Sequence, residues 1–335
     1  MRRSNLTTVV YILITCLVFV NIFIYSKIIT HSIPEAVYPS TSDSAADALD
    51  ESSGTPDGEG GSAFAMPEGY RYITVNVSDT YSGPLILVNA SHPYEFDNVP
   101  TAVAPDISDS VYYNKTSSYA AKDINVALNT TVIQALNRMM DDFYEIKGSR
   151  SVMINEGLRT REEQESILAQ KIAELGEDQT IAAKPGYSEH HSGYAMDLLL
   201  YENGIAATFT GEGEYSWFSE NAHKYGFILR YPEGKEDITG ISYESWHFRY
   251  VGVPHAEYIY KNGLALEEYI EMLGFYPIES AKLSETDSVS GDNYVVYSAA
   301  VPSDGTQVPV PDGAAGEAYT ISGDNNGHVI ITVKQ

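Results

Sequence analysis

The chain has 335 residues, of which 20 are Lys or Arg and 46 are Asp or Glu, so its formal net charge is −26. This charge argues against nucleic-acid binding, which depends on Lys and Arg neutralising phosphates. Hydrophobic residues make up 43% of the chain, which is enough for a sizeable core and excludes disorder throughout. The single cysteine excludes an intrachain disulfide and a cysteine-based zinc site. Any metal ion must therefore be held by His, Asp or Glu.

The amino-terminal segment contains an uncharged apolar run from Leu6 to Tyr25. A helix over this run would be roughly 30 Å long, which matches the hydrocarbon core of a bilayer. Two arginines precede the run and only Lys27 follows closely, which favours a cytoplasmic amino end. We therefore expect a single-pass membrane anchor within residues 1–30, with the rest of the chain outside the cell. A lipoprotein cleavage box ending at Cys16 and a cleaved signal peptide remain alternatives.

Residues 31–68 differ in composition from the segments on either side. They contain eight acidic residues, no Lys or Arg, and many Ser, Gly, Ala and Pro. Such a segment cannot bury enough apolar surface to offset the entropy lost on ordering. We predict a disordered acidic linker between the membrane and the folded part.

From residue 70 the pattern becomes that of a folded domain. Short β-branched and aromatic runs predict strands, and apolar residues at helical spacing predict helices. The expected strands are 72–77, 85–88, 152–155, 193–201, 227–229 and 246–251. The expected helices are 131–146, a helix that begins with a capping box at 160–163 and continues to 175, then 216–225 and helical material over 255–273. Because these elements mix without regular βαβ alternation, we predict an α+β fold.

Residues 276–335 are again acidic and rich in Ser, Gly and Pro. They include β-like patches at 294–297 and 329–333. The pattern allows either a small β appendage or a partly ordered tail, and it does not decide between them.

Chemistry-bearing residues gather in two segments, 188–197 and 243–250. His190, Asp197 and His247 form a set of three ligands, and three protein ligands with one open position are typical of catalytic zinc. Strand alternation places Asp197 on the same face as the small Ala195, which would keep space clear beside it. Taken alone, scattered His and Asp near aromatic residues are more often surface or core groups than ligands. Composition by itself therefore favours the ordinary interpretation.

Glu244 lies three residues before His247, and this spacing requires a particular backbone conformation if both side chains belong to one site. On a regular strand, side chains three residues apart point to opposite faces. Both can reach one site only if the backbone bends near Glu244 and Ser245 before the strand begins.

Two motifs together carry a resemblance to a known family. They are Ser188-x-His190-x-x-Gly193-x-Ala195-x-Asp197 and Glu244-x-Trp246-His247. Their combination resembles the signature of the VanY-type D-alanyl-D-alanine carboxypeptidases, a zinc peptidase group that includes the VanX-like D,D-dipeptidases and shares its fold with hedgehog signalling domains. The similarity extends in order through 85–89, 157–164, 185–188 and 225–232. The chain departs from the family at Ser245, where Pro is frequent, and at Leu158, where Tyr is frequent; these positions affect the bend and the pocket shape.

The resemblance implies a role for each matched position. His190, Asp197 and His247 would bind one Zn²⁺ per chain, and Glu244 would be the catalytic base. Arg159 would stabilise the transition state or bind the substrate carboxylate. Gln164 and Ser188 would line the substrate site. The implied fold is an antiparallel sheet flanked by helices, within a catalytic domain at 69–275.

The sequence therefore predicts a membrane-tethered, extracellular zinc carboxypeptidase, acting as a monomer, that removes D-alanine from peptidoglycan stem peptides ending in D-Ala-D-Ala. An L,D-carboxypeptidase and a D,D-dipeptidase of the same family are alternatives. A non-catalytic zinc-containing module that binds wall peptide is a third. Glu244 argues against the third, because a binding module needs no base three residues before its last histidine.

Overall fold

The computed structural model describes residues 68–335, except 105–106, 180 and 280–281. The chain divides into two units, residues 1–61 and 62–335, and only the second contains described residues. The predicted membrane anchor and all of the predicted linker except Glu68 lie outside the described residues. Among the helices of the described part, none has the length and apolar character needed to cross a membrane.

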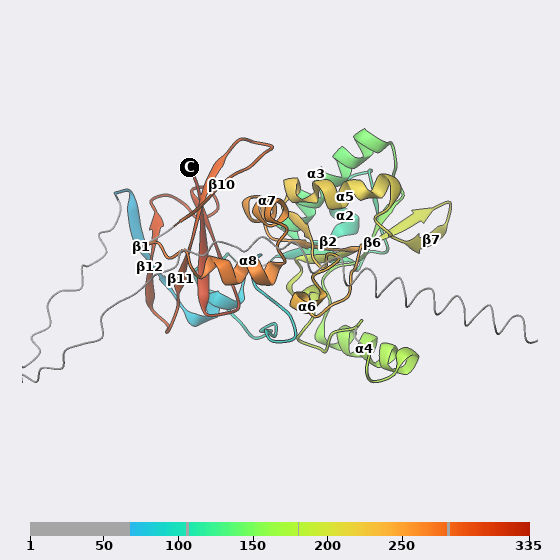
Figure 1. Cartoon of the computed structure of the whole chain (residues 1–335), viewed down its shortest axis with the longest axis horizontal. Helices are drawn as coiled ribbons and strands as arrows, with labels where there is room; N and C mark the ends of the chain where they lie inside the picture. The colour runs from blue at the N-terminus through green and yellow to red at the C-terminus, as the bar shows by residue number, and fades with distance from the viewer. Residues whose placement is uncertain (1–67, 105–106, 180, 280–281) are drawn as a thin grey trace, which may run out of the picture. The chain divides into compact units, whose positions relative to one another are not determined.

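A six-stranded sheet forms the centre of the region between residues 120 and 250 (Figure 1). Its order is β3-β5-β6-β9-β8, and β7 pairs with β6. Its strands are β3 (Ala120–Ala121), β5 (Val152–Glu156), β6 (Ala195–Glu202), β7 (Ile205–Thr208), β8 (Phe227–Leu229) and β9 (His247–Tyr250). The β3–β5 pair is parallel and the other pairs are antiparallel. The short strands β2 (Ser108–Ser110) and β4 (Ala127–Asn129) form a separate antiparallel pair.

Helix α3 (Thr130–Lys147) supplies much of the core behind this sheet. The side chain of Asn129 accepts a hydrogen bond from the Thr131 N–H at its start, and the helix ends at Gly148, whose φ of 72° glycine adopts without strain. Its buried face includes Leu136, Met139 and Phe143, at the spacing that the sequence predicted.

The remaining helices are shorter or lie at the edge. The α-helices are α2 (Val111–Asn114), α4 (Arg161–Leu175), α5 (Ser216–Asn221), α6 (Glu236–Thr239), α7 (Val253–Asn262) and α8 (Leu266–Leu273). The 3₁₀ helices are η1 (Val77–Tyr81), η2 (Glu189–Ser192), η3 (Gly213–Tyr215) and η4 (Ala222–Tyr225). Figure 1 shows α4 projecting at the periphery. Its capping box of Thr160 and Glu163 is formed, which confirms the predicted helix start.

The carboxy-terminal region contains regular strands. Antiparallel strands in the order β10-β11-β14-β13 form a four-stranded sheet, and β12 pairs with β1 from the start of the described chain. Their bounds are β1 (Tyr70–Val75), β10 (Leu283–Thr286), β11 (Asn293–Ala300), β12 (Thr306–Pro311), β13 (Tyr319–Gly323) and β14 (His328–Lys334). In Figure 1 the blue β1 lies among the orange and red strands. The structure therefore places the first strand of the expected catalytic domain beside the last sixty residues.

The prediction of a mixed fold of helices and sheets is confirmed, and two local expectations are wrong. The expected strand 72–77 ends at Val75, because Val77 already begins η1, and 85–88 form no strand. The segment 85–88 is buried, but its backbone bonds to side chains and loops instead of a neighbouring strand. The Leu85 N–H donates to Ser322 Oγ at 2.8 Å, and the Leu87 N–H donates to the Asp324 carbonyl at 3.1 Å. The run is apolar because it is buried, and its backbone groups find hydrogen-bond partners although it belongs to no sheet.

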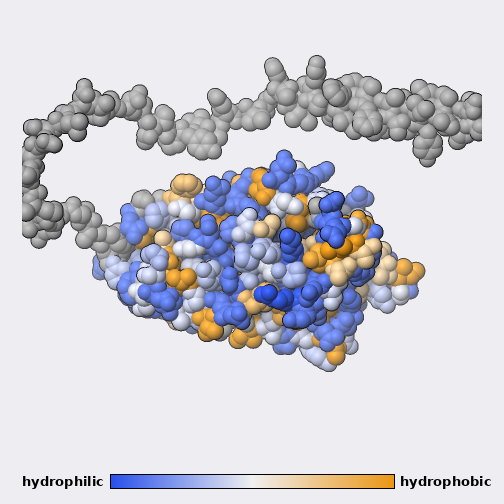
Figure 2. Space-filling view, turned by 90° about the horizontal axis from the view of Figure 1, so that it is seen from below, coloured by the Kyte–Doolittle hydropathy of each residue, from blue (hydrophilic) through white to orange (hydrophobic). Residues whose placement is uncertain are grey.

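The surface carries hydrophobic residues in small groups among hydrophilic ones. Figure 2 shows this on one face of the molecule. Exposed apolar side chains scattered in this way are ordinary on a folded protein.

Candidate active site

The three predicted ligands meet at one point of the sheet. Ligand atoms of His190, Asp197 and His247 all lie within 4.8 Å of one another. The sheet register explains two of them, because Asp197 on β6 stands directly opposite His247 on β9. The third comes from η2, the 3₁₀ turn that leads into β6. The sequence predicted this set, and the structure brings all three residues together.

Each imidazole has one nitrogen held by the protein and the other directed to the cluster. His190 Nδ1 lies 2.8 Å from the Gly157 carbonyl, which can only accept, so Nδ1 carries the proton and Nε2 presents its lone pair. His190 Nε2 is 3.5 Å from Asp197 Oδ2. His247 Nδ1 is 2.8 Å from Asp197 Oδ1, and its Nε2 is 3.4 Å from Glu189 Oε2.

The electrostatics of the cluster suit a cation. Burial lowers the pKa of His190, which keeps this imidazole neutral and able to act as a ligand. Burial opposes ionisation of Asp197, but the neighbouring His190 and His247 outweigh it and hold the pKa of Asp197 below its usual range. For His247, burial is outweighed by the hydrogen bonds to Asp197 and Glu189, which raise its pKa to about 9. Two imidazole nitrogens and one carboxylate are a donor set that zinc accepts.

Glu244 reaches the cluster because the backbone bends just before β9, as its position three residues before His247 requires. Residues 245 and 246 form a turn before β9, and the His247 N–H bonds back to the Glu244 carbonyl at 3.3 Å. Glu244 Oε2 lies 4.0 Å from His247 Nδ1. Burial raises the pKa of Glu244 to about 7. The expected bend is confirmed, and it puts a carboxylate beside the cluster.

Arg159 approaches the same space from the loop between β5 and α4. Its Nη1 donates to Gln164 Oε1 at 2.7 Å, and its Nη2 lies 3.7 Å from Glu156 Oε2. Its buried Nε–H has no hydrogen-bond partner among the described residues. Gln164 is itself buried and donates to the Ala183 carbonyl at 2.7 Å, which fixes the amide that holds Arg159. A buried donor without an acceptor costs free energy unless a ligand accepts its hydrogen bond.

One cavity of about 800 Å³ joins all the predicted site residues. Its lining includes the three ligand residues, Glu244, Arg159, Gln164 and Ser188. Tyr231 also lines it, and its ring stacks on His247 with the centroids 4.9 Å apart. The predicted residues thus share one pocket, while the separate roles of Gln164 and Ser188 stay predictions.

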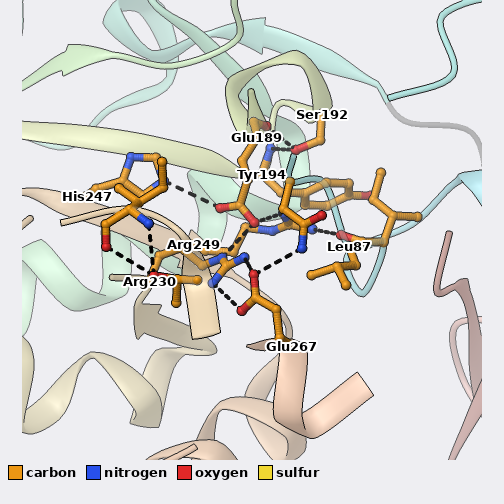
Figure 3. Close-up of polar contacts among 12 residues, drawn as sticks. Leu87, Glu189, Ser192, Tyr194, Arg230, His247, Arg249 and Glu267 are labelled. Atoms are coloured by element: carbon orange, nitrogen blue, oxygen red, sulfur yellow. Dashed lines mark hydrogen bonds and ion pairs between the residues drawn. The ribbon is translucent and has the colours of Figure 1, made fainter. Parts of the chain in front are cut away.

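Sequence reasoning missed a buried ionic cluster beside the ligands, which Figure 3 shows. Glu189 lies between Arg230 and Arg249, and all three side chains are fully buried. The available signal was a single arginine directly after the apolar strand 227–229 and another within the strand 247–250, since a buried charge needs a partner.

His191 lies beside the proposed ligand His190 in η2 and is buried. Its Nδ1 contacts the Arg159 carbonyl at 2.7 Å, and its Nε2 accepts from the Gly186 N–H at 3.0 Å. Through these two contacts it holds together the loops around the site.

This fold and site define a metallopeptidase-like centre, and comparisons with known proteins agree with that class. The family model VanY, described as D-alanyl-D-alanine carboxypeptidase, matches residues 125–253. A D-alanyl-D-alanine carboxypeptidase of Enterococcus faecium is 36% identical over 262 residues, 78% of each chain. The bifunctional D-Ala-D-Ala dipeptidase and D-Ala-D-Ala carboxypeptidase VanXYC of Enterococcus gallinarum is 34% identical over 197 residues, 56% of this chain and 94% of that protein.

A solved structure extends the likeness to three dimensions. The vancomycin resistance D,D-dipeptidase VanXYg, in complex with a D-Ala-D-Ala phosphinate analog, matches with a TM-score of 0.66 and 30% identity. The match covers 79% of this chain and 99% of that one. The chain belongs to the VanY family of D-alanyl-D-alanine carboxypeptidases. The resemblance drawn from the two motifs is therefore confirmed, and so is the prediction of an enzyme.

Proposed function

We propose that this chain is a zinc-dependent carboxypeptidase that removes the terminal D-alanine from peptidoglycan stem peptides ending in D-Ala-D-Ala. The observation that carries the proposal is the convergence of His190, Asp197 and His247 within 4.8 Å, in a pocket that also contains Glu244 and Arg159. The names of the relatives support this substrate, since they are carboxypeptidases or dipeptidases of D-Ala-D-Ala.

The three ligand residues would hold Zn²⁺ and leave a coordination position open. When bound, zinc lowers the pKa of a water molecule to about 7 and polarises the carbonyl that is attacked. The chain's contribution is to fix the two imidazoles through Gly157 and Glu189 and to bury both of them.

Glu244 would act as the general base. Its carboxylate lines the pocket beside His247 and, within the described part of the chain, makes no ion pair closer than 4.0 Å, so an oxygen is free to accept a proton. Its raised pKa lets it hold that proton and then pass it to the amine of the departing D-alanine. This transfer needs no other titratable group.

Arg159 would bind the negative charge of the substrate. Its side chain is held by Gln164, so the guanidinium is oriented before the substrate arrives, and its unpaired Nε–H offers a donor. A fixed donor stabilises a developing oxyanion or a terminal carboxylate without reorganising during the reaction.

Product masses decide between the candidate reactions. The full chain in detergent, loaded with zinc, is incubated separately with a pentapeptide stem, a tetrapeptide stem and free D-Ala-D-Ala. Loss of one alanine from the pentapeptide supports the proposal. Cleavage of only the tetrapeptide would replace it with an L,D-carboxypeptidase, and cleavage of only the free dipeptide would replace it with a dipeptidase.

We also propose that residues 1–30 anchor the enzyme in the cell membrane, that 31–68 are a linker, and that the catalytic domain at 69–275 acts outside the cell as a monomer. The uncharged run from Leu6 to Tyr25 supports the anchor. One chain supplies every residue of the proposed site, which supports the monomer. Resistance of the membrane-bound enzyme to carbonate extraction tests the anchor, digestion by protease added to whole cells tests the location outside the cell, and light scattering in detergent tests the monomer.

A further inference from the structure

Glu189 is a buried carboxylate in direct contact with a proposed metal ligand. Its Oε2 lies 3.4 Å from His247 Nε2. Its Oε1 accepts from Arg230 Nε at 2.8 Å and from Arg249 Nη1 at 2.9 Å. Figure 3 shows the carboxylate directed between these three side chains. One oxygen is therefore committed to two arginines, and the other faces the imidazole.

The arginines are themselves anchored on the side away from the ligands. Arg230 makes a two-pronged contact with Glu267 of α8, at 2.8 Å and 2.6 Å. Arg249 Nη2 donates to the carbonyls of Pro84 and Ile86, both at 2.9 Å. The cluster of Glu189, Arg230, Arg249 and Glu267 contains two negative and two positive groups, so its formal charges balance. Such balance allows charges to remain buried.

We propose that Glu189 is a positioning residue that selects the tautomer of His247, placing the proton on Nε2 and leaving Nδ1 as the nitrogen that binds metal. A carboxylate at Nε2 can only accept, so it stabilises the proton there and fixes the rotation of the ring. Nδ1 is then the nitrogen that faces Asp197, at 2.8 Å. This inference rests on the proposed metal centre and adds to it the group that orients the last ligand.

A matched pair of variants separates this role from a general effect of charge. Glu189→Gln and Glu267→Gln each remove one negative charge from the same balanced cluster, but only the first changes the group at His247 Nε2. Zinc affinity is measured by competition with a chelator, on protein whose folding has been checked by circular dichroism after EDTA treatment. We expect Glu189→Gln to weaken zinc binding by about 10- to 100-fold, and Glu267→Gln to bind zinc nearly as the wild type does. The visible spectrum of the Co²⁺-loaded protein should change in Glu189→Gln and not in Glu267→Gln.

Each outcome has a distinct meaning. Wild-type protein that fails to bind zinc would refute the metal centre itself. A wild type that binds zinc, with Glu189→Gln binding equally well, would overturn only the role of Glu189. Equal losses in the two variants would show that the charge of the cluster matters and not the contact with His247. If Glu189→Gln does not fold, the comparison is repeated between Glu189→Gln/Arg249→Met and Glu267→Gln/Arg249→Met, in which the charges balance again, and the same differences decide.

Discussion

The two proposed histidine ligands each direct one ring nitrogen to the cluster and the other to a neighbouring group of the protein. His190 is tied to the Gly157 carbonyl and His247 to Glu189, so neither ring can rotate without losing a buried hydrogen bond. Glu244 differs, because its carboxylate belongs to the pocket and is not tied in this way. The rings of His190 and His247 are thus fixed by the protein, whereas the carboxylate of Glu244 is free to react.

This separation predicts the effect of Glu244→Gln. The amide keeps the size of the side chain but cannot accept and return a proton, so kcat should fall by about 10²- to 10⁴-fold. Zinc affinity should stay close to the wild-type value, because Glu244 is not among the three ligands. Turnover of a pentapeptide stem and zinc competition are measured on the same preparation. A large loss of zinc would show instead that Glu244 is a ligand.

Arg159 gives a second prediction at this scale. Arg159→Lys keeps the charge but loses the planar set of donors that Gln164 orients, so kcat/KM should fall by about 10²- to 10³-fold. Arg161→Lys is the matched control, because Arg161 is an exposed neighbour that does not line the cavity, and its activity should be unchanged. Equal activity of the two variants would exclude a substrate contact by the Arg159 guanidinium.

At the scale of elements, the sequence correctly predicted those helices whose position depends on apolar periodicity and on capping residues close by in the chain. The helix over 130–147 and the capping box before α4 depend on neighbouring residues, and both formed as expected. The apolar run 85–88 did not become a strand, because its backbone partners lie more than two hundred residues away in 322–325. Glu189 was missed for a similar reason, since the arginines that explain it are distant in sequence. The resemblance carried by the two motifs identified the ligands, and contacts between residues distant in sequence hold them in place.

His255 shows how one side chain joins three elements. It lies on α7, its Nδ1 is 2.7 Å from the Tyr269 hydroxyl of α8, and its Nε2 is 2.9 Å from Thr332 Oγ1 of β14. Burial lowers its pKa from 6.5 to about 3. His255 therefore binds a proton less readily in the folded protein than in the unfolded chain. Its contribution to the free energy of unfolding is fully present above pH 6.5 and is lost as the pH falls toward 3.

The predicted pH effect is isolated by comparison with His255→Gln, which cannot titrate. One pKa unit corresponds to about 1.4 kcal/mol and the unfolded group is half protonated at pH 6.5, so the free energy of unfolding of the wild type relative to the variant should fall by about 2 kcal/mol between pH 6.5 and 4.5. Urea unfolding of both proteins at three pH values measures this difference. Other titrating groups contribute equally to both proteins and cancel. A difference that is constant with pH would mean that His255 has the same pKa in the folded protein as in the unfolded chain.

At the scale of the described molecule, the carboxy-terminal strands share a core with the helices behind the site. One buried cluster contains Leu85, Ile259 and Leu273 together with Val296 of β11 and Ile330 of β14. The segment 84–87 bonds both to residues 322–325 and to Arg249, which contacts Glu189. Physical contacts therefore run from the carboxy-terminal sheet to the residues around His247. The domain boundary at 275/276 stays a prediction, and these contacts argue that the two parts unfold together.

The positions of the tryptophans make this testable, because the chain has two and both lie in the catalytic part, at Trp217 and Trp246. Ile331 belongs to a different buried cluster, built from β1 and the carboxy-terminal strands, which contains neither tryptophan. Ile331→Ala should destabilise that cluster by about 2–5 kcal/mol. If the parts unfold as one, the transition followed by tryptophan fluorescence must shift by the full amount.

The neighbouring residue provides the control for this experiment. Ile330 points to the shared cluster from the opposite face of β14, so Ile330→Ala should lower the fluorescence transition whether or not the parts are independent. Urea denaturation of the wild type and the two variants is followed by fluorescence and by circular dichroism. Coincident transitions that shift in both variants establish one cooperative unit. If Ile331→Ala leaves the fluorescence transition in place and Ile330→Ala moves it, the carboxy-terminal sheet unfolds by itself. The hydrogen bonds between residues 84–87 and 322–325 would then not be needed to keep the site folded.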